Sequence, residues 1–562
     1  MSAITILILG IIGLCFGWFV YSKYVAVHIF RLDPDFETPA HELEDGVDYI
    51  PTNKYVLWGH HFTSVAGAAP IVGPAIAVYW GWVPAVLWVI FGSIFFAGVH
   101  DMGALWASVR HKGKSIGALS ENVIGPRTRA LYMVVVFLVL LMVNSVFGVV
   151  IANAFVSTPS SVLPAWSAIV VALVIGQLLH RNMMKLGVLT AIGVAVLYAS
   201  IYAGSEMPLS LPSGLPGLGI PATWIVILFV YAAIASMLPV WMLLQPRDFI
   251  NGMQLAVGLL LLYGAVLISG PEITAPAFNN QLAEGTPSLV PLLFVTIACG
   301  AVSGFHGIVA SGTTSKQLDK EPDTRFVGYF AALGEGALAL ITLIAVTGVA
   351  LAATPEEWHE TYSHFGAGSV GAFIKGGANL IESGWGISAG LASTLLATMV
   401  ALFAGTTMDS GVRLQRYIIQ EWGEIYNIKW ITNGIVATGI AVGACLVLAF
   451  GAGGLEGNGG MTIWPLFGST NQILAGMTLL VLSVMLIKKR RPAMVTLVPM
   501  VFVLCMSVIA SAIIFMQFLR EGNYLLMVIN AVVLITSLLV VLESLSVISK
   551  ERAKQRAEKS KA

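Results

Sequence analysis

The sequence predicts an all-α protein that crosses a membrane many times, and three observations carry this prediction. Apolar residues make up 57% of the 562 residues and charged residues only 10%, whereas soluble domains contain about 25% charged residues. Apolar runs of about 20 residues, the length that a helix needs to cross a bilayer, recur along the chain. Lysine and arginine lie almost entirely between these runs. This composition excludes a soluble globular enzyme and a disordered chain.

Fifteen apolar runs predict about fifteen transmembrane helices. The predicted spans are 2–22, 61–82, 84–109, 130–155, 164–180, 186–203, 221–244, 254–270, 290–312, 327–352, 386–406, 430–450, 461–487, 494–519 and 523–548. The remaining loops are mostly short, so no sizeable soluble domain is expected.

The distribution of basic residues predicts how the chain is oriented. With fifteen spans, every lysine and arginine except Lys375 and Arg520 falls in alternate loops. Cytoplasmic loops carry the excess of basic residues. We therefore expect a multi-pass protein with its N-terminus outside and its C-terminus in the cytoplasm. The basic tail at 549–562 is typical of a solvated helix end, with contact to anionic membrane lipids as the alternative.

Charge and cysteine usage exclude several partner classes. The 29 basic residues balance 29 acidic residues, whereas binding to nucleic acid needs a basic surface. The four cysteines (Cys15, Cys299, Cys445 and Cys505) lie in apolar runs, and no CxxC motif occurs. Neither a disulfide framework nor a thiolate metal site is expected. No cofactor is predicted.

Glycine and proline interrupt two of the predicted spans. The second span contains Gly67, Pro70, Gly73 and Pro74, and the seventh contains Pro239. Lipid cannot satisfy the backbone groups that such residues free, so a break persists only against protein or a wet cavity. These two spans are therefore expected to be discontinuous helices, with coincidental proline kinks as the alternative.

The positions of the breaks predict the architecture. The two interrupted spans begin five spans apart, so they run in opposite directions. This arrangement is typical of the LeuT-type core, a five-plus-five inverted repeat in which each half opens with a discontinuous helix. The predicted divisions are an N-terminal helix (1–22), a cytoplasmic segment (23–60), repeat one (61–203), repeat two (221–406) and four C-terminal helices (430–548).

A broken helix offers a binding site for an anion. The N-terminus of a helix carries about +0.5 charge and open N–H groups. A small anionic or zwitterionic solute is therefore expected at the breaks. The predicted substrate-binding residues are Ala66, Gly67, Ala68, Pro70, Gly73, Pro74, Ser236 and Pro239.

Few ionisable residues lie inside the predicted spans, and such residues are functional candidates because they are costly in lipid. His61, Asp101, His306 and Glu335 all fall in the predicted cytoplasmic half of the membrane. Histidine exchanges protons near neutral pH, so these four residues predict a proton relay. Hydrogen-bonded structural roles are the alternative. A metal site is not expected, although the set His60, His61, His100 and Asp101 has suitable ligand types.

Two further polar groups carry alternative roles. A sodium site is the alternative to proton coupling, built from the Ala66 carbonyl and the hydroxyls of Ser303, Thr313 and Thr314; these hydroxyls could equally bond their own helix. Asp409 and Arg413 are four residues apart, which predicts a gating or structural ion pair on one helix face.

Several strings resemble the carbon starvation protein A family, in order and over nearly the whole chain. They are Asp48–Lys54, Gly59–Pro74, His100-Asp101, Phe305-His306, Ser311–Gln317, Thr407–Asp409 and Phe467–Gln472. The resemblance implies uptake of pyruvate or small peptides across the inner membrane in carbon starvation, driven by protons. The chain looks like a short member, and some relatives have Gln where His100 stands.

The competing functions are a membrane sensor of external carbon and an intramembrane enzyme. A sensor needs a signalling domain, and the inner segments are too short for one. No GxSxG or HExxH motif lies in a span, so no catalytic residue is predicted. The Walker A motif of a primary pump is also absent from the sequence. A secondary transporter, a symporter rather than an enzyme, is therefore expected.

Overall fold

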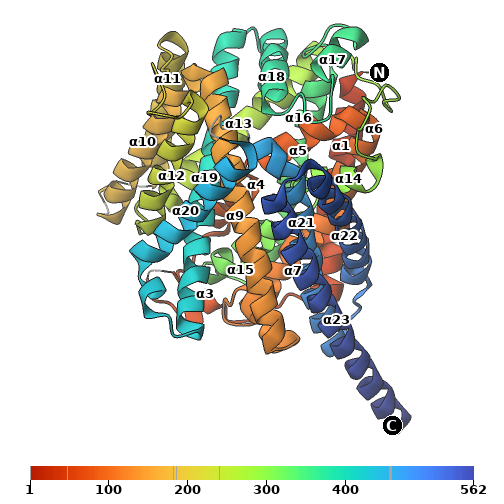
Figure 1. Cartoon of the computed structure of the whole chain (residues 1–562). Helices are drawn as coiled ribbons and strands as arrows, with labels where there is room; N and C mark the ends of the chain where they lie inside the picture. The colour runs from red at the N-terminus through yellow and green to blue at the C-terminus, as the bar shows by residue number, and fades with distance from the viewer. Residues whose placement is uncertain are drawn as a thin grey trace.

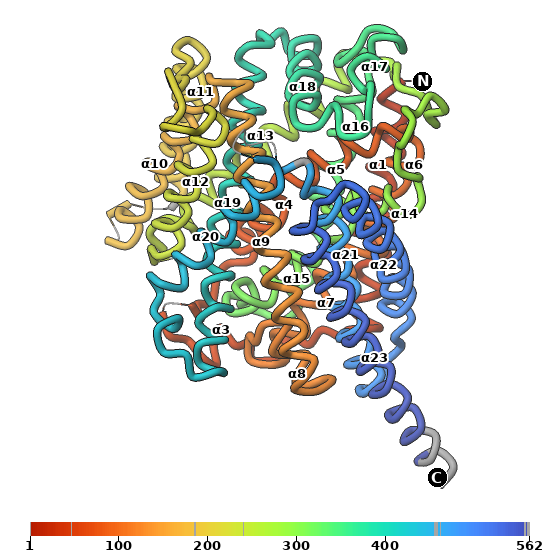
Figure 2. Tube along the Cα trace, in the orientation of Figure 1, coloured from red at the N-terminus to blue at the C-terminus, as the bar shows by residue number. Residues whose placement is uncertain are grey.

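In the computed structural model the chain forms a bundle of helices (Figures 1 and 2). The structure describes residues 2–561 except 47, 182, 185, 240 and 455–458. The helices are α1 (Ala3–Phe16), α2 (Ser22–Tyr24), α3 (Pro39–Glu42), α4 (Lys54–Ala66), α5 (Ala69–Ala77), α6 (Trp82–Gly92), α7 (Gly98–Val109), α8 (Ile116–Val123), α9 (Pro126–Ser157), α10 (Val162–His180), α11 (Leu186–Glu206), α12 (Ile220–Met237), α13 (Leu244–Ser269), α14 (Leu289–Thr296), α15 (Gly304–Gly312), α16 (Phe330–Thr347), α17 (Pro355–Thr361), α18 (Val370–Trp385), α19 (Ala389–Ile425), α20 (Gly434–Gly453), α21 (Gly459–Lys488), α22 (Met494–Glu521) and α23 (Tyr524–Lys561).

The prediction of an all-α polytopic membrane protein is confirmed. Within the described residues, thirteen helices are long and apolar enough to cross a membrane, or fourteen if the bent pair α4–α5 counts as one span. The run predicted at 290–312 is instead split into two short helices, α14 and α15. The first helix also continues through π turns to Phe30, beyond the predicted end at residue 22.

The first predicted break is present. Helices α4 and α5 meet at an angle of 44°, and Gly67 between them has φ of +49°. A Cβ atom on Gly67 would lie 2.8 Å from both the Phe147 ring and Thr407 Oγ1. The positive φ and this close packing both require glycine. The helix begins at Lys54, seven residues earlier than predicted, because Asn53 caps it by accepting a hydrogen bond from the Tyr55 amide.

The break predicted at Pro239 is wrong. Helix α12 ends at Met237 and α13 begins at Leu244, so Pro239 lies between two helices rather than within one span. Proline cannot donate the backbone hydrogen bond that would continue a helix. Arg413 donates to the carbonyl of Leu238 (2.6 Å) and so satisfies the end of α12.

The second discontinuous helix is formed by α14 and α15. Residues 297–303 between them are not helical, and Gly300 has φ of +91°. The freed Gly300 carbonyl accepts a hydrogen bond from Ser93 Oγ (3.0 Å). Protein, rather than lipid, therefore satisfies this break.

The packing of the helices places the two broken pairs, α4–α5 and α14–α15, in equivalent positions in the bundle. Helix α5 packs on α16, and correspondingly α15 packs on α7; the two long helices α9 and α19 pack against each other. Six spans separate the broken pairs, namely α6–α7, α9, α10, α11, α12 and α13, so the pairs run in opposite directions.

We infer from this packing that the repeats are placed differently from the predicted 61–203 and 221–406. Repeat one contains α4 to α13, with α10 and α11 added at the edge of the bundle (Figure 1). Repeat two contains α14 to α21. Only α22 and α23 then follow the core, instead of the four C-terminal helices expected at 430–548.

The ends of the bundle agree with the predicted alternation of loops. The N-terminus, α17 and α18 lie at one end, whereas α3, α8 and the C-terminus lie at the other (Figures 1 and 2). Helices α17 and α18 occupy the loop predicted to lie outside, between spans ten and eleven. Which end faces the cytoplasm stays a prediction.

Candidate functional site

The two breaks lie against each other in the core. A Cβ atom on Gly73 of α5 would lie 2.5 Å from the carbonyl oxygen of Thr296, at the end of α14. A Cβ atom on Gly300 would lie 3.6 Å from Pro70 Cα. The missing side chain at Gly73 therefore allows the two discontinuous segments to touch.

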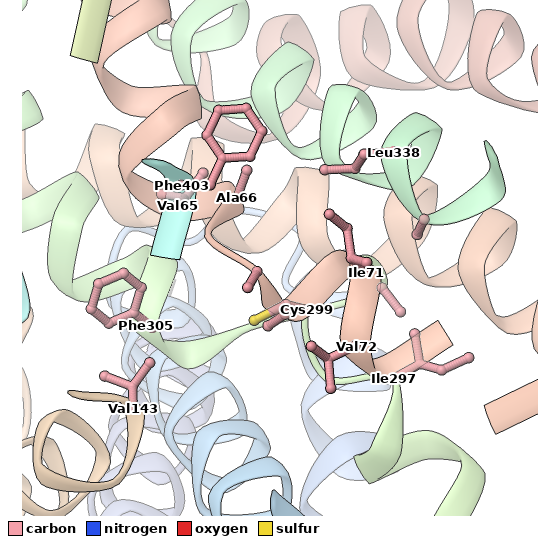
Figure 3. Close-up of a cluster of buried hydrophobic side chains, with 14 of the residues drawn as sticks. Val65, Ala66, Ile71, Val72, Val143, Ile297, Cys299, Phe305, Leu338 and Phe403 are labelled. Atoms are coloured by element: carbon pink, nitrogen blue, oxygen red, sulfur yellow. The ribbon is translucent and has the colours of Figure 1, made fainter. Parts of the chain in front are cut away.

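Apolar side chains surround this contact (Figure 3). Val65 and Ile71 flank the first break, Ile297 and Phe305 flank the second, and Phe403 of α19 lies beside Val65; all five are buried. The backbone groups freed at the breaks thus lie in a medium of low polarity. Electrostatic interactions are stronger there than in water.

The predicted substrate-binding residues separate into two groups. Ala66, Gly67, Ala68, Pro70, Gly73 and Pro74 are buried and form the first break. Ser236 and Pro239 do not join them: Ser236 Oγ donates to the Ala233 carbonyl of its own helix (2.9 Å), and Pro239 is exposed. The prediction for these two residues is wrong because it depended on the misplaced second break.

Three of the four predicted relay residues form one cluster. His306 Nδ1 lies 2.8 Å from Asp101 Oδ2, and His306 Nε2 lies 3.2 Å from Glu335 Oε2. His100 Nδ1 adds a contact of 2.7 Å to Asp101 Oδ1. All four side chains are fully buried, and they come from α7, α15 and α16. We call Asp101, His306 and Glu335 the central triad. His61 lies outside this set of contacts, with Nδ1 2.9 Å from Thr314 Oγ1, but it is near enough to interact electrostatically with Asp101 and His306.

The central triad adjoins the second break. Cys299 lies within the break, and its sulfur is within 4.8 Å of a ring nitrogen of His306 and a carboxylate oxygen of Glu335. Nitrogen, sulfur and oxygen ligands at such spacing could hold a metal such as zinc. His306 Nδ1 contacts Asp101, whereas His306 Nε2 and both Glu335 oxygens have no hydrogen-bond partner among the described residues. We interpret the cluster as a chain for protons. The four residues considered as metal ligands from the sequence (His60, His61, His100 and Asp101) do not form one cluster, because His60 contacts Asp248 and His61 contacts Thr314.

Asn471 of α21 holds the second break in place. Its Oδ1 accepts from the Phe305 amide (2.9 Å), and its Nδ2 donates to Ser303 Oγ (3.0 Å). Asn471 stands in one of the strings that carry the family resemblance, but nothing in the sequence indicated this contact. The first of these hydrogen bonds satisfies one of the open amides at the N-terminus of α15.

The residues of the alternative sodium site do not converge. Ser303 bonds Asn471, Thr313 Oγ1 donates to the Val309 carbonyl of its own helix (3.1 Å), and Thr314 contacts His61. No hydrogen bond found in the described part of the chain joins these hydroxyls to Ala66. The structure therefore gives no support to this set as one cation site.

A second buried ionic cluster connects α4, α12, α13 and α19. Asp409 pairs with Arg247 and accepts from Tyr231 Oη (2.7 Å). The neighbouring Asp248 contacts His60 Nδ1 (2.8 Å). The predicted pair of Asp409 with Arg413 is wrong, because Arg413 instead binds the carbonyls at the end of α12. Sequence reasoning missed Arg247 and Asp248 because it placed them in a loop.

Comparisons with known proteins agree with this geometry. A sequence model of the family described as "Carbon starvation protein CstA" matches residues 2–355 and 346–510. "Peptide transporter CstA" of Campylobacter jejuni is 32% identical, with 93% of this chain and 82% of that protein covered. "Pyruvate/proton symporter BtsT" of Escherichia coli is 31% identical, with 90% of this chain and 80% of that protein covered.

The fold is also found among solved structures. A manganese transporter of Eremococcus coleocola superposes with a TM-score of 0.50 at 11% identity, covering 91% of this chain and 99% of that one. At this identity the likeness shows the fold alone. The predicted LeuT-type architecture is confirmed.

Proposed function

We propose a solute and a coupling ion from one premise: this chain belongs to the carbon starvation protein CstA family. The family predicted from its motifs is confirmed, and the chain is a secondary transporter of the membrane. Our proposal is that it imports a small carboxylate of the pyruvate type across the inner membrane and that protons drive this import. Its N-terminus would face outside and its C-terminus the cytoplasm.

The first break supports a small carboxylate. Helix α5 begins at Ala69, two residues after Gly67, so the N-terminal end of this helix lies at the break, where Phe147 and Thr407 pack against Gly67. Open N–H groups and the helix dipole favour a negative charge at this point. The apolar side chains around the break, Val65 and Phe403 among them, suit a short apolar body such as a methyl ketone.

The observation that carries the proton proposal is the central triad. Asp101, His306 and Glu335 form a continuous chain of buried titratable groups that ends beside Cys299 in the second break. Chains of Asp, Glu and His of this kind serve as proton relays in pumps and transporters. A proton added to the triad changes the charge beside the break and so shifts the balance between loaded and empty states.

The proposal predicts proton-driven accumulation in proteoliposomes. We expect [14C]pyruvate to accumulate against its gradient when the outside is acidic and both sides contain potassium instead of sodium. Dialanine is the matched test for a peptide, which the names of several relatives suggest as the second candidate. Accumulation of dialanine alone would contradict the carboxylate proposal, and accumulation only with sodium would contradict proton coupling.

The proposed orientation has its own test. Cysteines introduced at Ser213 and Glu357 should react in intact cells with a reagent that cannot cross the membrane. Cysteines introduced at Ser115 and Asp319 should react only after the cells are opened. The reverse pattern would contradict the orientation without affecting the fold.

A further inference from the structure

A small cavity lies on one side of the first break. It runs between α4, α15 and α19, and its lining extends from buried Ser64, three residues before Gly67, to Tyr417, which is 42% exposed. Its volume is about 40 Å³. A water molecule needs roughly 10–15 Å³ by this measure, so the cavity has room for a carboxylate group. It reaches the surface beside Asp48 and Tyr417, which are both exposed.

Arg413 brings a buried and uncompensated positive charge to this cavity. Its side chain is part of the lining, and the residue is only 6% exposed. One terminal nitrogen donates to the carbonyls of Leu238 and Ala235, but Nε has no hydrogen-bond partner among the described residues. Buried charges are normally paired because removing them from water is costly.

The acid nearest to Arg413 along α19 is not available to neutralise it. Asp409 pairs with Arg247 and Tyr231. In the part of the chain that the structure describes, no carboxylate forms an ion pair with Arg413. A second nitrogen, Nε2 of His60, also lacks a partner among the described residues, and His60 lines the same cavity.

Hydroxyl groups add to the polar lining of this space, to which Gln245, Thr313 and Gln317 also contribute. Ser64 and Ser410 line the cavity, and both residues are buried. At its exposed end, Lys316 adds a positive charge and Asp48 a negative one, 3.7 Å apart. The buried end thus holds a guanidinium that forms no ion pair among the described residues, the His60 imidazole and two hydroxyls. Asp248 Oδ2 contacts His60 Nδ1 (2.8 Å) and accepts from Ser64 Oγ (3.5 Å). The guanidinium, together with Nε2 of a doubly protonated His60 and the Ser410 hydroxyl, supplies donors that suit a carboxylate.

We propose that Arg413, His60, Ser64 and Ser410 form a second binding site for a small carboxylate, on the inner side of the first break. We call these four residues the inner anion site. It lies between the break and the open end of the cavity, so a solute leaving the break meets it on the way out. The proposal rests on the proposed function in taking the solute to be a carboxylate and in placing the exposed end of the cavity on the cytoplasmic side.

The experiment measures whether the site attracts negative charge, and it does not depend on transport. The purified full-length Ser410→Cys variant is treated with two methanethiosulfonate reagents, one bearing a sulfonate and one bearing a trimethylammonium group. We expect the sulfonate reagent to react faster. Adding Arg413→Gln should slow it by about tenfold, because one buried charge no longer attracts it. Arg413→Lys should keep the preference.

Small probes separate binding from general accessibility. Acetate and pyruvate should protect the introduced cysteine, whereas acetamide, a neutral molecule of similar size, should not. The chain without the introduced cysteine corrects for the native thiols. Arg416→Gln is the matched control, since it removes a charge from the same helix but does not line the cavity.

The possible outcomes decide the proposal. Equal rates for the two reagents, no protection by acetate, or no reaction with either reagent would each overturn it. If Arg413→Gln fails to fold, protection of the Ser410→Cys variant by acetate but not by acetamide still shows whether the site binds a carboxylate. Protection by acetate in a protein that transports no pyruvate would keep the inner anion site and reject the proposed solute.

Discussion

The two broken helices differ in what they present to the centre of the molecule. The first break contributes backbone and apolar groups around Gly67, and Phe147 and Thr407 pack directly against it. The second break adjoins the buried charges of the central triad, and Asn471 holds it in place. We propose from this difference a division of labour, in which the first break binds the solute and the second carries the proton.

Substituting Gly67 should have the largest effect. We expect Gly67→Leu to abolish solute binding and uptake, because even a Cβ atom there meets Phe147 and Thr407 at 2.8 Å. Equilibrium binding of labelled pyruvate to purified protein measures the loss. Gly371→Leu is the control, since a Cβ atom at Gly371 on α18 meets no atom within 4 Å. Unchanged uptake by the Gly67→Leu variant would remove the solute from the first break.

Neutral substitutions in the central triad should remove accumulation but not solute exchange. His306→Gln keeps a hydrogen-bonding side chain but cannot take up a proton. Asp101→Asn and Glu335→Gln should act alike, because both carboxylates contact His306. The measurement compares pH-driven accumulation with exchange of labelled for unlabelled pyruvate.

Two further histidine substitutions serve as comparisons for the triad variants. His180→Gln changes an exposed histidine at the end of α10 and should accumulate solute normally. His61→Gln tests the fourth predicted relay residue, which lies outside the triad. If all four relay substitutions still accumulate pyruvate under a proton gradient, the relay is wrong and sodium replacement becomes the next experiment.

Asn471→Ala should have an intermediate effect, confined to the second break. It leaves the buried Phe305 amide without its partner, which costs about 1–3 kcal/mol. We expect a lower thermal midpoint together with weakened coupling of uptake to the proton gradient. Asn530→Ala removes a comparable buried amide from α23, distant in the chain from both breaks. Equal loss of coupling in the two variants would show that Asn471 acts only through stability.

Metal chelation should have the smallest effect. Cys299, His306 and Glu335 are close enough to share an ion, but the proton interpretation predicts no role for one. Dialysis against a strong chelator should leave pyruvate uptake unchanged, and elemental analysis of the purified protein should find less than one metal per chain. Stoichiometric zinc, with uptake that depends on it, would contradict the proton interpretation.

Much of the fold could be predicted from the sequence because helix length and loop charge follow from the bilayer itself. The first break was predictable because Gly67, Pro70, Gly73 and Pro74 stand together. The second was not, because residues 297–303 contain one glycine and no proline and so resemble an ordinary apolar span. Pro239 gave a false signal, since proline ends helices as readily as it interrupts them.

The candidate site could likewise be predicted from the sequence only in part. The depth of His306, Asp101 and Glu335 in their spans marked them as candidates, but their mutual contacts depend on how α7, α15 and α16 pack. The spacing of Asp409 and Arg413 allowed an ion pair on one helix, yet Arg247 and Tyr231 from other helices compete for the carboxylate. Local spacing cannot predict such a competition between distant segments.

Proton movement during pyruvate entry tests the division of labour most directly. Proteoliposomes containing a pH-sensitive dye are given external pyruvate without any imposed gradient of pH or sodium. The wild-type chain should acidify the lumen as labelled pyruvate enters. The His306→Gln variant should admit pyruvate without acidification, and Gly67→Leu should do neither beyond protein-free liposomes. Acidification by the His306→Gln variant in step with pyruvate entry would contradict the assignment of the proton to the second break.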